Sequence, residues 1–332
     1  MKKSCFLSII ATLLIVVTAV GCNGGGTTAS PSTPAPAATT NEDSSPPADV
    51  AEKKLVIGAT ILTREHVFWT MVEESLNEKA QELGVDIIVS DGKSSADSQY
   101  AQIQDFVTQK VDAIIVAPVS SAASASAAAL AKDAGIPVFS LVIDTNGERV
   151  SFIGVDNILG GELAGEYAAK VLGEEGQCAI ISWDDLDICI DRATGFKNII
   201  AEHPGMEIVS EISYAGDTNK AASVTQDFIT QFPDLKLIYA VGDPAAVGAV
   251  NTVKAAGKDI KVIGFDGNPE FYSGTKNDPE IWIADVQQDP RGCAAMAVQI
   301  AVDYLKNGTQ PQEINLIPPT MIDTEEVIAK GL

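Results

Sequence analysis

The sequence predicts an α/β protein with two doubly wound parallel-sheet domains, and two features of the chain favour that class. Short β-branched runs recur from Leu55 onward and alternate with stretches of helical period. Such alternation is typical of parallel sheets covered by helices on both faces. The chain of 332 residues is also long enough to bury more than one core.

The order of the elements predicts two similar domains. Glycines close several of the helical stretches, such as Gly84 and Gly257, because glycine readily takes the left-handed conformation that ends a helix. Roughly four β/α repeats precede "VSFIGVDNILGG" (150–161), and a similar series follows it. We therefore expect two domains that face each other across a cleft. The predicted strands are "LVIGATI" (55–61), "VDIIVSD" (85–91), "AIIVAP" (113–118), "VFSLVI" (138–143), "CAIISW" (178–183), "KLIYAV" (236–241) and "KVIGFD" (261–266).

The first residues predict export. Two lysines precede the apolar run "FLSIIATLLIVVTAV" (6–20), which is short for a membrane-spanning helix of about 20 residues. The run ends in "AVGC", which resembles the bacterial lipobox, so we expect a signal peptide (1–21) and a lipid on Cys22. An ordinary signal peptide is the alternative. Residues 22–53 are rich in Gly, Ser, Thr, Pro and Ala and are predicted to form a disordered tether. We expect a periplasmic or cell-surface protein anchored to the membrane by lipid.

Charge and missing motifs narrow the function. The 22 Lys+Arg against 45 Asp+Glu give a net charge of −23, which argues against a nucleic-acid partner. His66 and His203 are not spaced as metal ligands, and neither a phosphate-binding glycine loop nor a Gly-x-Ser-x-Gly motif is found. We expect no metal, no cofactor and no enzymatic activity. A disulfide between Cys178 and Cys189 stays open for an exported protein.

From about Leu55 to Ile322 the chain resembles the ribose-type periplasmic solute-binding proteins of ABC transporters. The resemblance implies the type I periplasmic binding protein fold, whose two domains are joined by a three-strand hinge and close on a solute. It also implies a membrane permease as partner, and we expect a monomer. The matching segments are "AQIQDFVTQKVDAIIVAP" (101–118), "GIPVFSL" (135–141), "IGVDNILGGELAGEYAAK" (153–170), "DRATGF" (191–196), "FPDLKLIYAVGDPAAVGAV" (232–250), "VIGFDGNPE" (262–270) and "VQQDP" (286–290).

The resemblance also implies how the chain is divided. The N-terminal lobe is expected to contain residues 54–155 plus 289–317. The C-terminal lobe is expected to contain residues 156–288 plus 318–332. In open parallel sheets a ligand lies outside the carboxyl ends of the strands, so the residues that follow the predicted strands are the candidates for a binding site.

The loop after the first strand, "TREHVFWT" (63–70), matches the place where such proteins present a polar residue and two aromatics. His66, Phe68 and Trp69 are therefore candidate ligand-binding residues. An aromatic ring can cover the C–H face of a sugar while polar groups take its hydroxyls. The alternative is that Phe68 and Trp69 open the first helix and pack in the core.

Three further positions match ligand-binding residues of the family. Arg192 corresponds to an arginine whose fork of donors suits paired hydroxyls or a ring oxygen; an exposed helix arginine is the alternative. Asp266 corresponds to an aspartate that accepts hydrogen bonds from vicinal hydroxyls, and Gly267 leaves room beside it; the alternative is a cap of the next turn. Gln288, at the third crossover, corresponds to a residue that both hinges and contacts sugar.

The chain also departs from the family pattern. Ala117 and Gly242 stand where ribose-type members often have asparagine, and "LVIDTN" (141–146) replaces their Asp-Arg pair. Asp144 and Asp243 are the nearest acids and are included as candidates. Trp183 is interpreted as a second stacking platform or a lid residue. These departures indicate a pocket that differs from one for ribose.

We expect the ligand to be a monosaccharide or polyol that is handed to the permease unchanged. A sensory receptor that docks on a membrane kinase or chemoreceptor is the alternative, with the same pocket. The export signal and the missing helix-turn-helix oppose a repressor of the lac type, and no set of catalytic residues supports an exported hydrolase.

Overall fold

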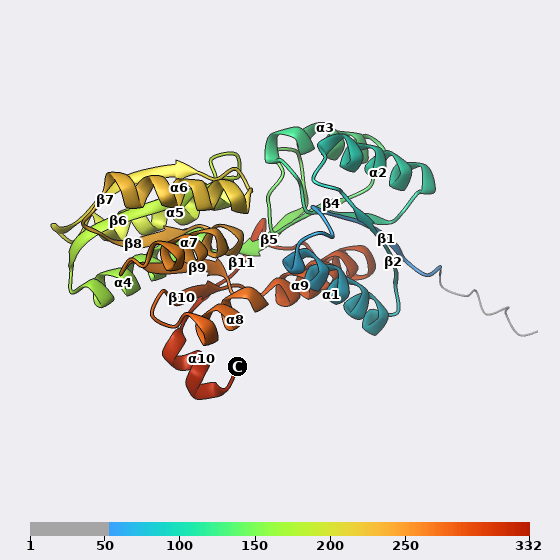
Figure 1. Ribbon diagram of the computed structural model, residues 1–332. Helices are drawn as coiled ribbons and strands as arrows, with labels where there is room; N and C mark the ends of the chain where they lie inside the picture. Colours follow the sequence, from blue (N-terminus) through green and yellow to red (C-terminus); the bar gives the residue numbers. More distant parts are fainter. Residues whose placement is uncertain (1–52) are drawn as a thin grey trace, which may run out of the picture. The chain divides into compact units, whose positions relative to one another are not determined.

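A computed structural model describes residues 53–332, which lie within one compact unit of the chain. The predicted signal peptide (1–21), Cys22 and nearly all of the predicted tether (22–53) lie outside the described residues. Figure 1 shows two groups of strands, each with helices packed around it. The α/β class and the doubly wound parallel sheets predicted from the alternating pattern are confirmed.

The first sheet has six strands, and all of its pairs are parallel. Its central strands are buried along their whole length, as expected where helices cover both faces. In spatial order the strands are β11 (Ile314–Ile317), β5 (Ser151–Val155), β4 (Val138–Leu141), β3 (Ala113–Val116), β1 (Val56–Ile61) and β2 (Asp86–Asp91).

The second sheet repeats this order. Its strands are parallel except for the last pair, in which β12 runs antiparallel to β10. In spatial order they are β12 (Thr320–Asp323), β10 (Trp282–Gln287), β9 (Lys261–Asp266), β8 (Leu235–Ala240), β6 (Glu175–Ser182) and β7 (Gly205–Ser213). The seven predicted runs each correspond to a strand, but they omit the interior strands β5 and β10 and the edge strands β7, β11 and β12. Edge strands expose polar positions and so lack a continuous apolar run.

Helices cover the two sheets in packed pairs. Helix α1 packs with α9 and α2 packs with α3 around the first sheet, while α4 packs with α5 and α6 packs with α7 around the second. The helices are α1 (Val67–Leu83), α2 (Ala96–Gln109), α3 (Ser121–Asp133), α4 (Asn157–Leu172), α5 (Asp187–Ile200), α6 (Thr218–Gln231), α7 (Asp243–Ala256), α8 (Pro269–Asn277), α9 (Pro290–Asn307) and α10 (Thr324–Lys330).

The chain passes from one sheet to the other three times, after β5, after β10 and after β11. In each sheet the strand order reverses between the first and third strands, β1 and β3 in one and β6 and β8 in the other. Ligands of open α/β sheets bind at the carboxyl ends of strands beside such a reversal. The topology therefore directs attention to the loops after β1, β6 and β8.

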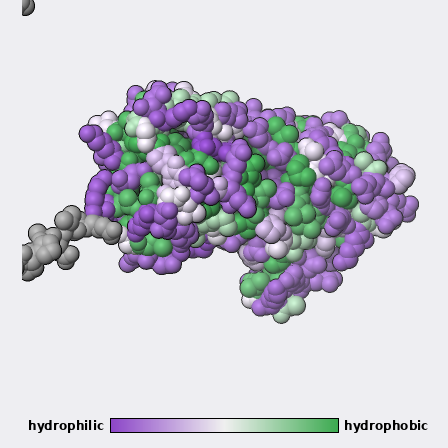
Figure 2. All heavy atoms as spheres, turned by 180° about the vertical axis from the view of Figure 1, so that it is seen from behind, coloured by the Kyte–Doolittle hydropathy of each residue, from purple (hydrophilic) through white to green (hydrophobic). Residues whose placement is uncertain are grey.

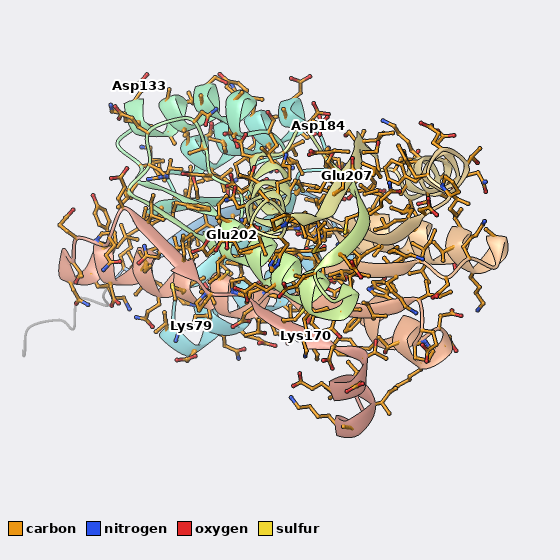
Figure 3. All side chains as sticks on the ribbon, turned by 90° about the vertical axis from the view of Figure 1, so that its left-hand side faces the viewer. Lys79, Asp133, Lys170, Asp184, Glu202 and Glu207 are labelled. Atoms are coloured by element: carbon orange, nitrogen blue, oxygen red, sulfur yellow. The ribbon has the colours of Figure 1, made fainter. Side chains whose placement is uncertain are left out.

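The acidic side chains lie largely at the surface. Figure 2 shows hydrophilic residues over much of one face, with hydrophobic residues gathered between them. Figure 3 labels Asp133 at the end of α3, Asp184 in the loop before α5, Glu202 just after α5 and Glu207 on β7, and all four are exposed. The acidic charge thus mainly meets solvent. Among residues 53–332, no helix is both long and apolar enough to cross a membrane.

Candidate functional site

A cavity of about 280 Å³ lies at the carboxyl ends of strands from both sheets. Loops that follow β1 and β4 of the first sheet, and β6, β8, β9 and β10 of the second, contribute to its lining. A cavity of this size accommodates a small solute. Seven of the nine predicted ligand-binding residues line it: His66, Phe68, Trp69, Trp183, Arg192, Asp266 and Gln288.

The polar side of the cavity centres on Asp266. Its Oδ1 accepts hydrogen bonds from Nη1 of Arg192 at 3.0 Å and from Nε2 of Gln288 at 2.6 Å. Three groups are left over from these contacts. Oδ2 of Asp266 and Nη2 of Arg192 make none of these bonds, and buried Oε1 of Gln288 has no partner among residues 53–332. The cluster thus offers one donor group and two acceptors to a bound molecule.

Several contacts fix the side chain of Arg192 in this cluster. Its Nε donates to Asn157 at 2.9 Å, Nη1 also donates to the carbonyl of Val241 at 2.8 Å, and the guanidinium lies 3.8 Å from the centre of the Phe265 ring. The side chain is only 4% exposed. Burial acts to lower the pKa of Arg192, while Asp266 and other neighbours raise it, and the net result is a raised pKa. Arg192 is therefore a fixed cation.

Close packing of α5 against α4 sets the position of Arg192. A Cβ atom on Gly161 of α4 would lie 2.0 Å from the carbonyl oxygen of Arg192, and one on Gly195 of α5 would lie 2.1 Å from the carbonyl oxygen of Ile158. Only glycine permits two helix backbones to approach this closely. The glycines in "ILGGELAG" and "RATGF" therefore fix the helix that carries the arginine.

Asp266 has a strained backbone, with a φ of 123°, which residues other than glycine rarely adopt. The two following N–H groups hold it in place. Gly267 N donates to Oδ1 of Asp285 at 2.9 Å, and Asn268 N donates to Oδ2 of Asp243 at 2.8 Å. Asp243 and Asp285 are both buried. This pair of carboxyl groups therefore fixes the loop from which Asp266 reaches the cavity.

The two buried carboxyl groups interact with each other, and the pKa of each is raised. Burial raises the pKa of Asp285 to about 7, and burial together with Asp285 raises the pKa of Asp243 well above its ordinary value. Asp285 also accepts from Trp282 Nε1 at 3.2 Å. Asp285 thus receives two N–H donors and Asp243 receives one, and each of these donors opposes the rise in pKa that burial causes.

The loop after β1 supplies an aromatic side of the cavity. Phe68 and Trp69 meet edge to face, with ring centres 5.1 Å apart. His66 caps α1, and its Nδ1 accepts from the backbone N–H of Phe68 at 3.3 Å. Phe68 and Trp69 are both buried and also line the cavity. Phe68 and Trp69 thus both pack in the core, which was one interpretation from the sequence, and both line the cavity, which was the other.

Trp183 lies opposite a tyrosine that the sequence analysis did not select. Its ring packs edge to face against Tyr214, with centres 5.4 Å apart. A Cβ atom on Gly216 would lie 2.7 Å from the indole, so the glycine makes room for it. Tyr214 follows β7 directly, and its hydroxyl lies 3.6 Å from where a Cβ atom on Gly242 would be. Prediction of β7 as a strand would have marked Tyr214 as a strand-end residue.

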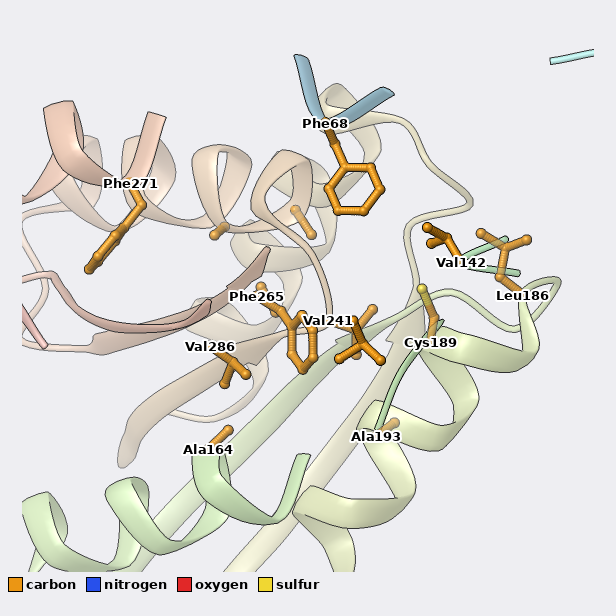
Figure 4. Packing of buried hydrophobic residues seen from close by; sticks show 14 of the residues in the cluster. Phe68, Val142, Ala164, Leu186, Cys189, Ala193, Val241, Phe265, Phe271 and Val286 are labelled. Carbon is orange, nitrogen blue, oxygen red and sulfur yellow. The ribbon is translucent and has the colours of Figure 1, made fainter. Parts of the chain in front are cut away.

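Aliphatic side chains form the remaining side. Its main residues, which the sequence did not predict for the site, are Val142 and Ile143 after β4, and Leu186, Ile188 and Cys189 at the start of α5; Leu62 and Val241 also line the cavity. Strand-end polar residues were the signal used to find the site, and a nonpolar strand end gives no such signal. Figure 4 shows Val142, Leu186 and Cys189 close together.

The structure places Asp144 and Asp243 outside the cavity lining. Strand β4 ends at Leu141, so Val142 and Ile143 take the strand-end positions and Asp144 lies further along. There its carboxylate binds Arg149 through two hydrogen bonds, at 2.5 and 2.6 Å. Asp243 is the first residue of α7, and its buried carboxyl group accepts from Asn268 N instead of lining the cavity.

The cysteines Cys178, Cys189 and Cys293 are free and buried, and burial raises the pKa of each to about 12. The open disulfide between Cys178 and Cys189 is therefore not formed. Within residues 53–332, no group of three or more histidine, cysteine or acidic side chains is arranged to hold a metal ion.

Comparisons with known proteins agree with this architecture. The family described as periplasmic binding protein domain matches residues 57–310. The ribose import binding protein of Escherichia coli is 31% identical over 261 residues, 77% of this chain and 86% of that protein. The D-apiose import binding protein of Paraburkholderia graminis is 32% identical over 256 residues, 75% of this chain and 81% of that protein.

A solved structure of a solute binding protein is also similar to this chain. An ABC transporter solute binding protein from Bacillus halodurans, with bound myo-inositol, is similar with a TM-score of 0.76 and 29% identity, covering 83% of this chain and 97% of that chain. The similarity therefore extends over both sheets and nearly the full length of that protein.

Proposed function

The chain belongs to the periplasmic binding protein domain family, and we propose that it captures a monosaccharide or polyol and delivers it to the permease of an ABC importer. Proteins of this family bind their solutes outside the cytoplasm. Relatives named for ribose and D-apiose import, and a structure with bound myo-inositol, support a polyhydroxylated solute.

The observation that carries the proposal is the buried cluster of Arg192, Asp266 and Gln288. We propose that the free Oδ2 of Asp266 accepts hydrogen bonds from hydroxyls of the solute, while Nη2 of Arg192 donates to a hydroxyl or ring oxygen. Because these groups are buried, a ligand that satisfies them gains charge-assisted hydrogen bonds in place of lost water contacts. Oε1 of Gln288, buried without a partner among the described residues, supports the same role.

The aromatic residues are proposed to sandwich the solute. Phe68 and Trp69 come from the loop after β1, and Trp183 comes from the loop after β6, so both sheets supply rings. A flat ring covers the C–H face of a sugar without competing for its hydroxyls. His66 is proposed to take part through Nε2, since its Nδ1 is used by the helix cap.

Hinge closure is the proposed mechanism. The lobes are proposed as residues 54–155 plus 289–317 and residues 156–288 plus 318–332, in agreement with the three passages of the chain between the sheets. A solute that contacts both lobes stabilises the closed arrangement by its differential interaction with the two states. We further propose a monomer without enzymatic activity, held to the membrane by a lipid on Cys22.

A thermal-shift screen of the purified protein tests the proposal. The protein is unfolded and refolded to remove any carried ligand, and melting is then measured with pentoses, hexoses, inositols, nucleosides and amino acids. A tight ligand at a hundredfold excess over its dissociation constant adds about 2.7 kcal/mol to the free energy of unfolding. We expect a selective shift with a sugar or polyol. A shift only with amino acids or nucleosides would contradict the proposed solute class.

The lipid anchor has its own test. Metabolic labelling with a fatty acid should mark the wild-type protein and leave Cys22→Ala unmarked. A chain that is exported and equally soluble with and without Cys22 would exclude the anchor and leave the binding function untouched.

A further inference from the structure

The cavity is chemically two-sided. Arg192, Asp266 and Gln288 supply its buried hydrogen-bonding groups. Val142, Leu186 and Cys189 are 3%, 7% and 4% exposed, belong to the hydrophobic core cluster and line the same cavity. In Figure 4 these three side chains gather together, away from Phe265, the ring beneath Arg192. One side of a bound molecule therefore meets hydrogen-bonding groups and another meets hydrocarbon.

The aliphatic side is built by an unfavourable backbone conformation. Val142 has a φ of 64°, and Ile143 N donates to the carbonyl of Leu141 at 2.7 Å, which closes a three-residue turn around Val142. A β-branched residue in this region is a marked outlier, and such strain is concentrated at ligand-binding sites. The nearest acid, Asp144, is bound to Arg149. The turn thus presents a valine at the strand end and keeps the carboxylate away.

A ligand hydroxyl placed against this side would lose its hydrogen bonds to water and gain none from these side chains. Val142, Ile143, Leu186 and Ile188 carry no polar side-chain atom, and the thiol of Cys189 is a weak donor and acceptor. A hydroxyl without a partner in such surroundings is disfavoured, whereas a methyl or methylene group is favoured. The two sides therefore select for a solute that is not hydroxylated all round.

We infer that the solute is amphipathic: a pair of neighbouring hydroxyls faces Asp266 and Arg192, and a deoxy carbon, methyl group or other apolar substituent faces Val142, Leu186 and Cys189. This inference rests on the proposed sugar or polyol function and specifies its ligand class. Deoxy sugars and alkyl glycosides belong to this class, and fully hydroxylated hexoses and inositols do not.

Calorimetric titration with matched pairs of sugars tests it. Each pair differs at one position: D-galactose and 6-deoxy-D-galactose, L-mannose and 6-deoxy-L-mannose, D-ribose and 5-deoxy-D-ribose, and each parent sugar with its methyl glycoside. We expect the deoxy or methylated member of at least one pair to bind about ten to a hundred times more tightly than its parent, since an apolar pocket rejects an added hydroxyl only by up to about a hundredfold.

The outcomes separate the inference from the function on which it rests. If the fully hydroxylated member binds more tightly in every pair that binds, the inference is wrong and the sugar-binding function stands. If no member of any pair binds and other polyols do not bind either, the proposed function fails, and the inference fails with it.

Two variants locate the selectivity, and one serves as control. Cys189→Ser and Leu186→Asn each place a polar group on the aliphatic side, and each should reduce the preference for the deoxy member to a few-fold or less. Ile190→Asn changes the same helix at a side chain that is 42% exposed and does not line the cavity, and it should keep the full preference. Melting without ligand shows that each variant folds. An unchanged preference in both folded cavity variants would overturn the assignment of this side.

Discussion

Nη1 of Arg192 lies 3.0 Å from Oδ1 of Asp266, in a setting where the two side chains are only 4% and 12% exposed. A buried pair of this kind contributes little net free energy to folding. Removing one partner is nevertheless strongly destabilising, because the other charge is then left buried without a partner. The same contact holds both charged groups in the cavity. Stability and ligand binding are therefore expected to change together when it is altered.

Asp266→Asn should show this coupling. The amide keeps the shape but removes the charge that Arg192 faces, so we expect the free energy of unfolding to fall by about 1–3 kcal/mol and solute affinity to fall at least tenfold. The matched control is Glu211→Gln, which breaks the pair between Lys197 of α5, the helix that carries Arg192, and Glu211 of β7; these side chains are 41% and 32% exposed. That change should cost less than about 1 kcal/mol. Denaturant unfolding of both variants makes the comparison, and equal losses would contradict it.

Two glycines near the site should differ in how strongly alanine destabilises the protein. On Gly264 a Cβ atom would lie 2.2 Å from Oδ2 of Asp285, whereas on Gly242 the nearest atoms, including Oδ2 of Asp266, are 3.6 Å away. We expect Gly264→Ala to lower the free energy of unfolding by about 1–3 kcal/mol through overpacking. Gly242→Ala should change it by about 0.5 kcal/mol or less. Thermal and denaturant unfolding measure both; a stable Gly264→Ala protein would show that the carboxyl pair can move.

The carboxyl pair of Asp243 and Asp285 predicts a pH dependence. The pKa of both groups is raised by burial, that of Asp285 to about 7, so the folded chain keeps protons that the unfolded chain loses near pH 4. The contribution is fully present below about pH 4 and is lost as pH rises through the raised pKa values, at a rate of at most about 1.4 kcal/mol per pH unit for each group. Unfolding measured from pH 4 to 8 should show this decline.

Asp285→Asn should make the decline shallower, because the amide cannot ionise and only Asp243 of the pair still titrates. The amide oxygen can still accept from Gly267 N. Asp259→Asn is the control, since the side chain of Asp259 is 89% exposed, and its pH profile should match that of the wild type. A wild-type slope retained in the Asp285 variant would show that the pair does not titrate in this range.

Tryptophan fluorescence should report binding through the two tryptophans that line the cavity. Trp69 and Trp183 line the cavity, whereas Trp282 is buried beneath it and donates to Asp285. A ligand that excludes water from the cavity should change the emission, and Trp183→Phe should remove much of the change. Trp282→Phe should leave the ligand-induced change in place, although it lowers the total intensity. Loss of the signal in the Trp282 variant alone would place the ligand elsewhere.

Some site residues follow from the sequence because their positions are fixed by strand ends. Asp266 closes a clear apolar strand, and Arg192 stands beside the glycine that allows α5 to approach α4. Tyr214 could not be selected in the same way, because it follows an edge strand, β7, whose polar positions conceal its pattern. The sequence favours Asp144 over Val142 as the site residue after β4, because an acid is the more obvious ligand-binding group. Only the structure shows that Arg149 binds the carboxylate of Asp144, so that Val142 lines the cavity instead.

The sequence by itself determined the α/β class, the alternation of strands and helices, and the polar strand-end residues, because hydrophobic period and glycine position are local properties of the chain. Only the tertiary structure decided which side chains share the cavity. Carboxyl groups 42 residues apart, those of Asp243 and Asp285, fix the loop that carries Asp266, and aliphatic residues from two sheets form one apolar side. Such contacts depend on strand order and helix packing, which bring distant segments together, and no local pattern specifies them.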